Sequence, residues 1–147
     1  YVFSQTDKTD KYRYIIRTHP VLPWDKLKNS IKLNNGIRAK LSNNVNLMDD
    51  LKLVDLCIYW GSTVALEALN MGIPLIHYDR QDIISYDPLF RCNYLKWTVN
   101  DNDSLRKKID TINSISDKEF VVQFKKAKKY INNYFYPVTS ENMSKFL

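Results

Sequence analysis

The tripeptide Gly61-Ser62-Thr63 contains the residue types of a phosphate-binding turn. It follows a short apolar run and precedes an apolar helical pattern, so we expect it between the carboxyl end of a strand and the amino end of a helix. There the glycine permits close approach, the two hydroxyls add donors, and free backbone N–H groups and the helix dipole favour an anion. The alternative is that Ser62 only caps the helix.

Glu67 lies one helical turn further along, on the same predicted stripe as Thr63 and Asn70. The rest of this predicted helix is apolar, and an ionised carboxylate is costly to bury there unless it is paired or bound. The vicinal hydroxyls of a ribose would satisfy it. The other interpretation is that the stripe faces water.

Arg17 and His19 stand at the end of an earlier apolar run and could place positive charge on a diphosphate. A His-Pro pair otherwise only terminates a strand, and His77, at the end of a later run, is a weaker candidate. The two histidines are far apart, with no acidic or cysteine cluster beside either, so no metal site is predicted. No spacing indicates a catalytic triad.

Short apolar runs alternate with helical patterns, which predicts an α/β fold with a Rossmann-like parallel sheet flanked by helices. We expect strands over 12–17, over 37–41 or 45–47, and over 56–59, 73–77 and 94–99. We expect helices over 23–34, 49–54 and 64–71 and two more after residue 104, the last opened by a capping box of Ser116 and Glu119. Ligands bind at the carboxyl ends of parallel strands, where the candidate residues would gather.

The chain has 147 residues, of which 44% are hydrophobic and 26% charged, as expected of a single folded domain over 1–147. No apolar run approaches the roughly 20 residues of a membrane helix. The first residues show no signal-peptide pattern. Cys57 and Cys92 are too few and too isolated for a disulfide scaffold or a zinc site, so a reducing cytoplasm fits best.

The formal net charge of +6 favours an anionic partner, which could be a nucleic acid, a membrane face or a small molecule. The lysines are scattered, apart from Lys107-Lys108 and a group over 125–129 on predicted helices. No groove of aromatic and arginine residues is apparent, so nucleic-acid binding is not expected. Peripheral association with the inner face of the membrane through the basic helices stays open.

The stretch over 54–76 resembles the donor-site segment of GT-B glycosyltransferases, which include bacterial capsule and surface-polysaccharide enzymes built from two Rossmann-like domains. The shared pattern is an Asp before a strand (Asp55), a small-residue turn, and a helix reading E-A-x-x-x-G-x-P from Glu67 to Pro74. The segment over 17–20 also resembles the His-Pro motif of bacterial sialyltransferases and of polyol-phosphate transferases that make wall teichoic acid. The resemblance covers about residues 12–135.

This resemblance implies one half of a GT-B architecture: a donor-binding domain that binds a nucleotide sugar without a metal or other cofactor. It implies that Ser62 and Thr63 contact the donor phosphates and Glu67 the ribose, with His19 near the diphosphate. Arg17 and Gly61 would belong to the same donor site. Where many retaining members have a second Glu this chain has Tyr59, so a retaining mechanism of that type is not predicted.

The resemblance also implies an N-terminal acceptor domain, which would supply the catalytic base. Because the chain begins with Tyr1 rather than Met, we expect it to be part of a longer two-domain chain, inactive by itself, with its first strand and glycine-rich loop truncated or absent. Two other functions stay open. One is a nucleotide-sugar 2-epimerase or a polyol-phosphate transferase on the same architecture. The other is a non-catalytic basic α/β interaction module.

Overall fold

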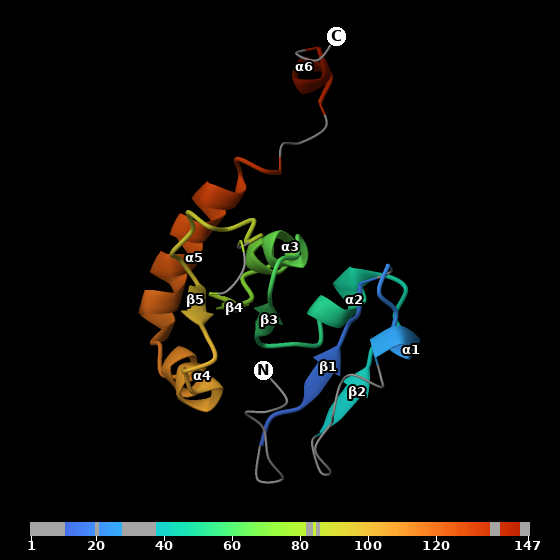
Figure 1. Ribbon diagram of the computed structural model, residues 1–147. Coiled ribbons are helices and arrows are strands. Elements are labelled where there is room, and N and C mark those ends of the chain that lie inside the picture. The colour runs from blue at the N-terminus through green and yellow to red at the C-terminus, as the bar shows by residue number, and fades with distance from the viewer. Residues whose placement is uncertain are drawn as a thin grey trace.

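Two parallel sheets organise the computed structural model, which describes residues 11–19, 21–27, 38–81, 84, 86–135 and 139–144. β1 (Tyr14–Ile16) pairs with β2 (Ala39–Leu41), and β3 (Cys57–Tyr59), β4 (Leu75–Tyr78) and β5 (Lys96–Val99) form a three-stranded sheet in that order. Helices pack against the sheets (Figure 1). The predicted α/β, Rossmann-like fold is therefore confirmed.

Six helices are present in the described residues: α1 (Trp24–Leu27), α2 (Leu47–Leu51), α3 (Val64–Asn70), α4 (Leu105–Asn113), α5 (Asp117–Ile131) and α6 (Ser140–Met143). Of the two strands considered over 37–47, the first is correct. Residue 47 instead begins α2, two residues before the predicted start, because the side chain of Asn46 caps this helix at the N–H of Met48. Residues 28–34 of the expected first helix, and the segment before residue 11, lie outside the described residues.

β3, α3 and β4 form a βαβ unit whose register pairs Cys57 with Leu75 and Tyr59 with His77. α3 ends where predicted, since Gly72 follows it with a φ of 81°. A Cβ at Gly72 would lie 3.3 Å from the ring of Phe124 in α5. The glycine therefore serves both the turn and the close packing of the two helices.

The three-stranded sheet has helices on both faces. On one face, α3 and α5 pack together through a cluster that includes Ala68, Leu69, Ala127 and Ile131. On the other face, α4 contributes three residues to a cluster with Ile76 of β4 and Val99 of β5: Leu105, Ile109 and Ile112. The burial of both faces accounts for the near-continuous apolar character of these strands.

Tyr12 connects the two sheets. Its ring packs in the α4 cluster together with Ile58 of β3, and its hydroxyl donates to Asp110 (3.1 Å) and accepts from Asn113 (3.3 Å). Figure 1 shows β1 on the side of its sheet that is nearer β3. The chain thus extends outward from β1 to β2 in one direction and from β3 to β5 in the other. Within one open sheet such a reversal marks a ligand site, whereas β1 and β3 here lie in separate sheets and are not paired.

Candidate functional site

The turn after β3 leaves several hydrogen-bond donors unused. Ser62 Oγ accepts from the N–H of Val64 (3.3 Å), while the N–H groups of Ala65 and Leu66 bond to the carbonyls of Ser62 and Thr63. Thr63 occupies the N-cap position without a side-chain cap bond. Within the described residues, no acceptor is bonded to the Thr63 hydroxyl or to the N–H groups of Ser62 and Thr63. The donors available to an anion are those of the turn, because the first amides of α3 are already engaged.

Gly61 lies against the segment that follows β4. A Cβ at this position would be 2.9 Å from the Cβ of Tyr86, a separation that side chains do not tolerate. Tyr86 is itself 69% exposed, and the neighbouring Trp60 is 43% exposed. The close approach that Gly61 permits is therefore to Tyr86.

Glu67 is half-buried on α3, one turn after the exposed Thr63 and one turn before Asn70. Asn70 is bound by the ammonium group of Lys128 in α5, which contacts both its side-chain and its backbone oxygen. The half-buried Glu67 carboxylate forms no hydrogen bond or ion pair with any described residue. It is thus available to accept hydrogen bonds from water or from a ligand.

Arg17 is held by the segment that leads into α2. Its Nη1 donates to Asp50 (2.5 Å) and to the carbonyl of Asn44 (2.9 Å), and its Nη2 donates to the carbonyl of Val45 (3.0 Å). Burial would raise the pKa of Asp50, but hydrogen bonds from Ser42, Arg17 and Asn44 outweigh it and lower that pKa. Arg17 therefore joins the end of β1 to the start of α2, and its predicted contact with a diphosphate stays a prediction.

His19 is exposed just beyond β1. Its Nδ1 accepts from the N–H of Val21 (3.2 Å), which places the ring proton of the neutral imidazole on Nε2. Nε2 could therefore donate to an anion. In the described part of the chain no hydrogen bond or ion pair joins Arg17 or His19 to the turn after β3. The predicted residues thus form two groups, one after each of the strands that flank the reversal.

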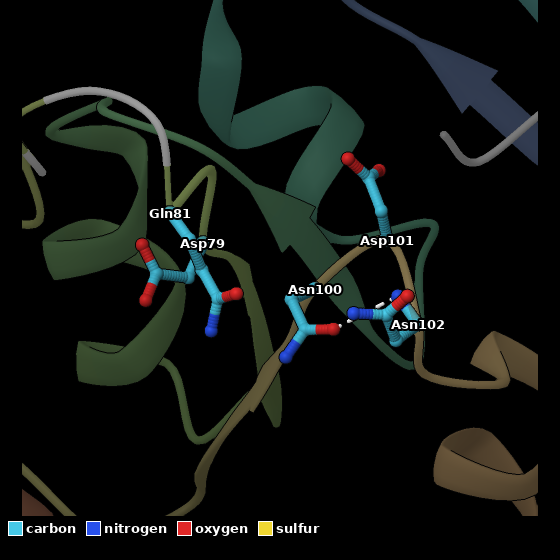
Figure 2. A pocket seen from close by; sticks show the side chains of 5 residues that line it. All are labelled: Asp79, Gln81, Asn100, Asp101 and Asn102. Atoms are coloured by element: carbon cyan, nitrogen blue, oxygen red, sulfur yellow. Dashed lines mark hydrogen bonds between the residues drawn. The ribbon is translucent and has the colours of Figure 1, made fainter.

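A surface cavity of about 310 Å³ lies at the carboxyl ends of β4 and β5 (Figure 2). Five polar residues line it: Asp79 and Gln81 after β4, and Asn100, Asp101 and Asn102 after β5. The Tyr78 hydroxyl donates to Asp101 (2.5 Å) and the N–H of Asn102 to the side chain of Asn100 (2.8 Å). Carboxylates and amide oxygens accept hydrogen bonds, so this cavity suits hydroxyl groups better than phosphates.

A buried polar cluster centred on Asp87, in the segment after β4, contacts side chains of all three strands of this sheet, and sequence reasoning missed it. Asp87 accepts from the Tyr59 hydroxyl (2.7 Å), from the N–H of Leu89 (2.9 Å) and from the ammonium group of Lys96, and lies 3.8 Å from His77 Nδ1. Burial would raise the pKa of Asp87, but the bonds from Lys96, Tyr59 and Leu89 lower it. The available signal was Lys96, a cation within a buried strand that needs an anionic partner.

His77 is 4% exposed, and its Nε2 has no hydrogen-bond partner among the described residues. Burial lowers the pKa of His77, and Lys96 acts in the same direction, although Asp87 and Asp79 oppose both. Burial also favours the neutral form of Tyr59 and so raises its pKa, and the hydrogen bond to Asp87 adds to that shift. His77 and Tyr59 are thus held neutral beside a charged pair.

Comparisons of the chain with protein-family models, with curated proteins and with solved structures give no match. Within the described residues, no group of three or more His, Cys, Asp or Glu side chains is arranged to hold a metal ion. No helix in the described ranges is long and apolar enough to cross a membrane.

Proposed function

We propose that this chain is the donor-binding domain of a glycosyltransferase and binds a nucleotide sugar at the carboxyl edge of β3, β4 and β5. The observation that carries the proposal is the set of unused donors in the turn after β3: the N–H groups of Ser62 and Thr63 and the Thr63 hydroxyl. Oriented amides and hydroxyls at the end of a parallel strand are the groups that hold phosphates in such folds.

The cavity after β4 and β5 supports the hydroxyl-rich part of this ligand. Neighbouring strands lie about 4.8 Å apart, so the carboxyl ends of β3 and β5 are separated by roughly 10 Å. A nucleotide sugar is long enough to reach from the turn at Ser62 to the carboxylates of Asp79 and Asp101. Glu67, half-buried on α3 and without a described partner, would accept from the ribose hydroxyls.

In this proposal the turn stabilises the nucleoside diphosphate as it leaves. Charge that develops on a leaving group is stabilised by donors already oriented toward it, so no divalent cation is required. His19, with its proton on Nε2, would add a donor from the other side of the reversal between β1 and β3. The base that activates the acceptor would come from another part of a longer protein.

Binding to the intact chain is the direct test. Calorimetry with uridine, guanosine and cytidine diphosphates should show affinity for one of them, and no sugar transfer by this chain alone. Thr63→Glu should abolish that binding while the fold is kept, because a carboxylate would occupy the place of the phosphate. Glu67→Ala should weaken binding by roughly 1.5–3 kcal/mol for each bond lost to a charged acceptor.

Thr111→Glu is the matched control, since it adds the same charge on the exposed side of α4. It should leave the affinity unchanged. Absence of binding to all three nucleotides would favour the non-catalytic module instead. Undiminished binding by a folded Thr63→Glu variant would remove the turn from the site.

A further inference from the structure

The outer side of α5 forms a cationic stripe. The helix packs toward α3 through Phe120, Phe124, Ala127 and Ile131, so its opposite side faces away from the core along one flank of the molecule (Figure 1). Four exposed residues on that side are spaced four, three and four residues apart and therefore line up along the helix. We refer to them as the α5 stripe: Lys118, Val122, Lys125 and Lys129. Val122, within the stripe, and Val121, beside it, are each 47% exposed.

The lysines of the α5 stripe form no ion pairs with described residues, although Asp117 and Glu119 flank Lys118 in the first turn of the helix. Lys118, Lys125 and Lys129 make no hydrogen bond or ion pair with any described residue. Lys128, on the side toward α3, differs because it binds Asn70. No acidic residue occurs in the sequence from 120 to 140. The stripe therefore presents free cations to whatever lies outside the helix.

The loop before β5 lies beside α5 and carries exposed aromatic residues. The ammonium group of Lys126 lies 5.3 Å from the ring centroid of Tyr94, which holds the loop beside α5. In the same loop the guanidinium of Arg91 lies 5.1 Å from the ring centroid of Phe90, and Phe90 is 65% exposed. The α5 stripe and this loop thus combine cations with exposed apolar side chains.

We infer that this surface docks on an anionic lipid membrane. Negative headgroups complement the unpaired lysines, and the boundary between headgroups and acyl chains accepts Val121, Val122 and Phe90. A nucleic acid would pair with the lysines through its phosphates but would give the valines no apolar contact. The outer side of a helix, unlike a groove, also suits a broad and flat partner. This inference is independent of the proposed nucleotide site.

Vesicle flotation with the full chain tests the inference. The protein should bind vesicles that contain phosphatidylserine, bind pure phosphatidylcholine vesicles weakly, and detach as salt rises above about 0.15 M. A variant with Lys118→Gln, Lys125→Gln and Lys129→Gln should partition on the order of 100-fold less, because each cation near an anionic surface contributes about fivefold. Replacing Val121 and Val122 with serine should weaken vesicle binding without affecting retention on heparin.

The control carries Lys26→Gln, Arg38→Gln and Lys40→Gln, which removes the same charge from exposed positions near α1 and β2. It should keep most of the vesicle binding. An equal loss in both triple variants would show that only net charge matters and would overturn the assignment of the surface. Equal binding to neutral and anionic vesicles, or no binding to either, would overturn it as well. DNA binding that is stronger than vesicle binding and indifferent to the valines would make nucleic acid the partner.

Discussion

Asp87 is ionised although it is almost completely buried, so both of its carboxylate oxygens need partners. The Tyr59 hydroxyl and the N–H of Leu89 donate to one oxygen and Lys96 to the other. A buried ion pair adds little net stability, but removing one partner leaves an uncompensated charge in the core. The main effect of this cluster is therefore positional, since it ties the segment after β4 to residues of β3, β4 and β5.

His77 makes the stability of the fold depend on pH. Because its pKa is lowered in the folded chain, the unfolded chain takes up a proton below about pH 6.5 that the folded chain does not. The free energy of unfolding should therefore fall as the pH drops from about 7.5 to about 5. The lowered pKa values of Asp50 and Asp87 act with the same sign, but only near and below their unfolded value of about 3.9.

Denaturant unfolding of two single variants over this pH range separates the contributions of the two histidines. His77→Phe should show a flatter dependence than the wild type, because it has no proton to gain. His19→Gln removes the exposed histidine and should keep the slope of the wild type. If His77→Phe also keeps that slope, then His77 titrates alike in both states and its burial is not the cause.

At the scale of elements, the end of α3 depends on Gly72. The residue has a positive φ, and a Cβ there would contact Phe124. Gly72→Ala should destabilise the protein by about 1–2 kcal/mol from the backbone alone, with a further cost if Phe124 cannot shift. Gly72→Asn adds the same Cβ, yet Asn tolerates a positive φ better, so it should cost less. Equal losses in chemical denaturation would assign the whole effect to the contact with Phe124.

Elements with strong local signals were predictable from the sequence. Gly72 ends α3 as expected, and Ser116 caps α5 at the N–H of Glu119. The Glu119 side chain, however, accepts from Gln123 rather than completing the predicted capping box. The start of α2 was predicted two residues too late, because the cap formed by Asn46 was not recognised in the sequence. α6 has no apolar periodicity and was not predicted.

The site was predictable only where its residues are close in sequence. Ser62, Thr63 and Glu67 lie on one strand-turn-helix unit, so their spacing was enough to group them. The ion pairs of Arg17 with Asp50 and of Lys96 with Asp87 join elements whose contact depends on tertiary packing. No periodicity in a single sequence carries that information. Asp50, within the predicted helix over 49–54, is buried and binds Arg17 at the end of β1.

At the scale of the whole molecule, side chains near the ends of β1 and β2 join these strands to the rest of the fold, among them Ser42, which follows β2 and donates to Asp50. The ring and hydroxyl of Tyr12 anchor the start of β1 to α4, and Arg17 joins its end to Asp50 of α2. β1 and β2 are three residues each and only partly buried, whereas β4 is largely buried. We therefore expect β1 and β2 to be less stable than the three-stranded sheet. The two groups of candidate residues lie where these two parts of the fold meet.

Hydrogen exchange should detect this difference directly. Amides of β1 and β2 are expected to exchange faster than those of β4, because local opening needs less buried surface to be exposed. Tyr12→Ala removes both the packing and the hydrogen bonds to α4, so it should lower the protection of β1 and β2 while β4 keeps most of its own. Tyr12→Phe retains the packing and should have a smaller effect. If Tyr12→Ala instead lowers protection equally in all strands, the two sheets unfold as one cooperative unit and the residues flanking the reversal cannot move independently.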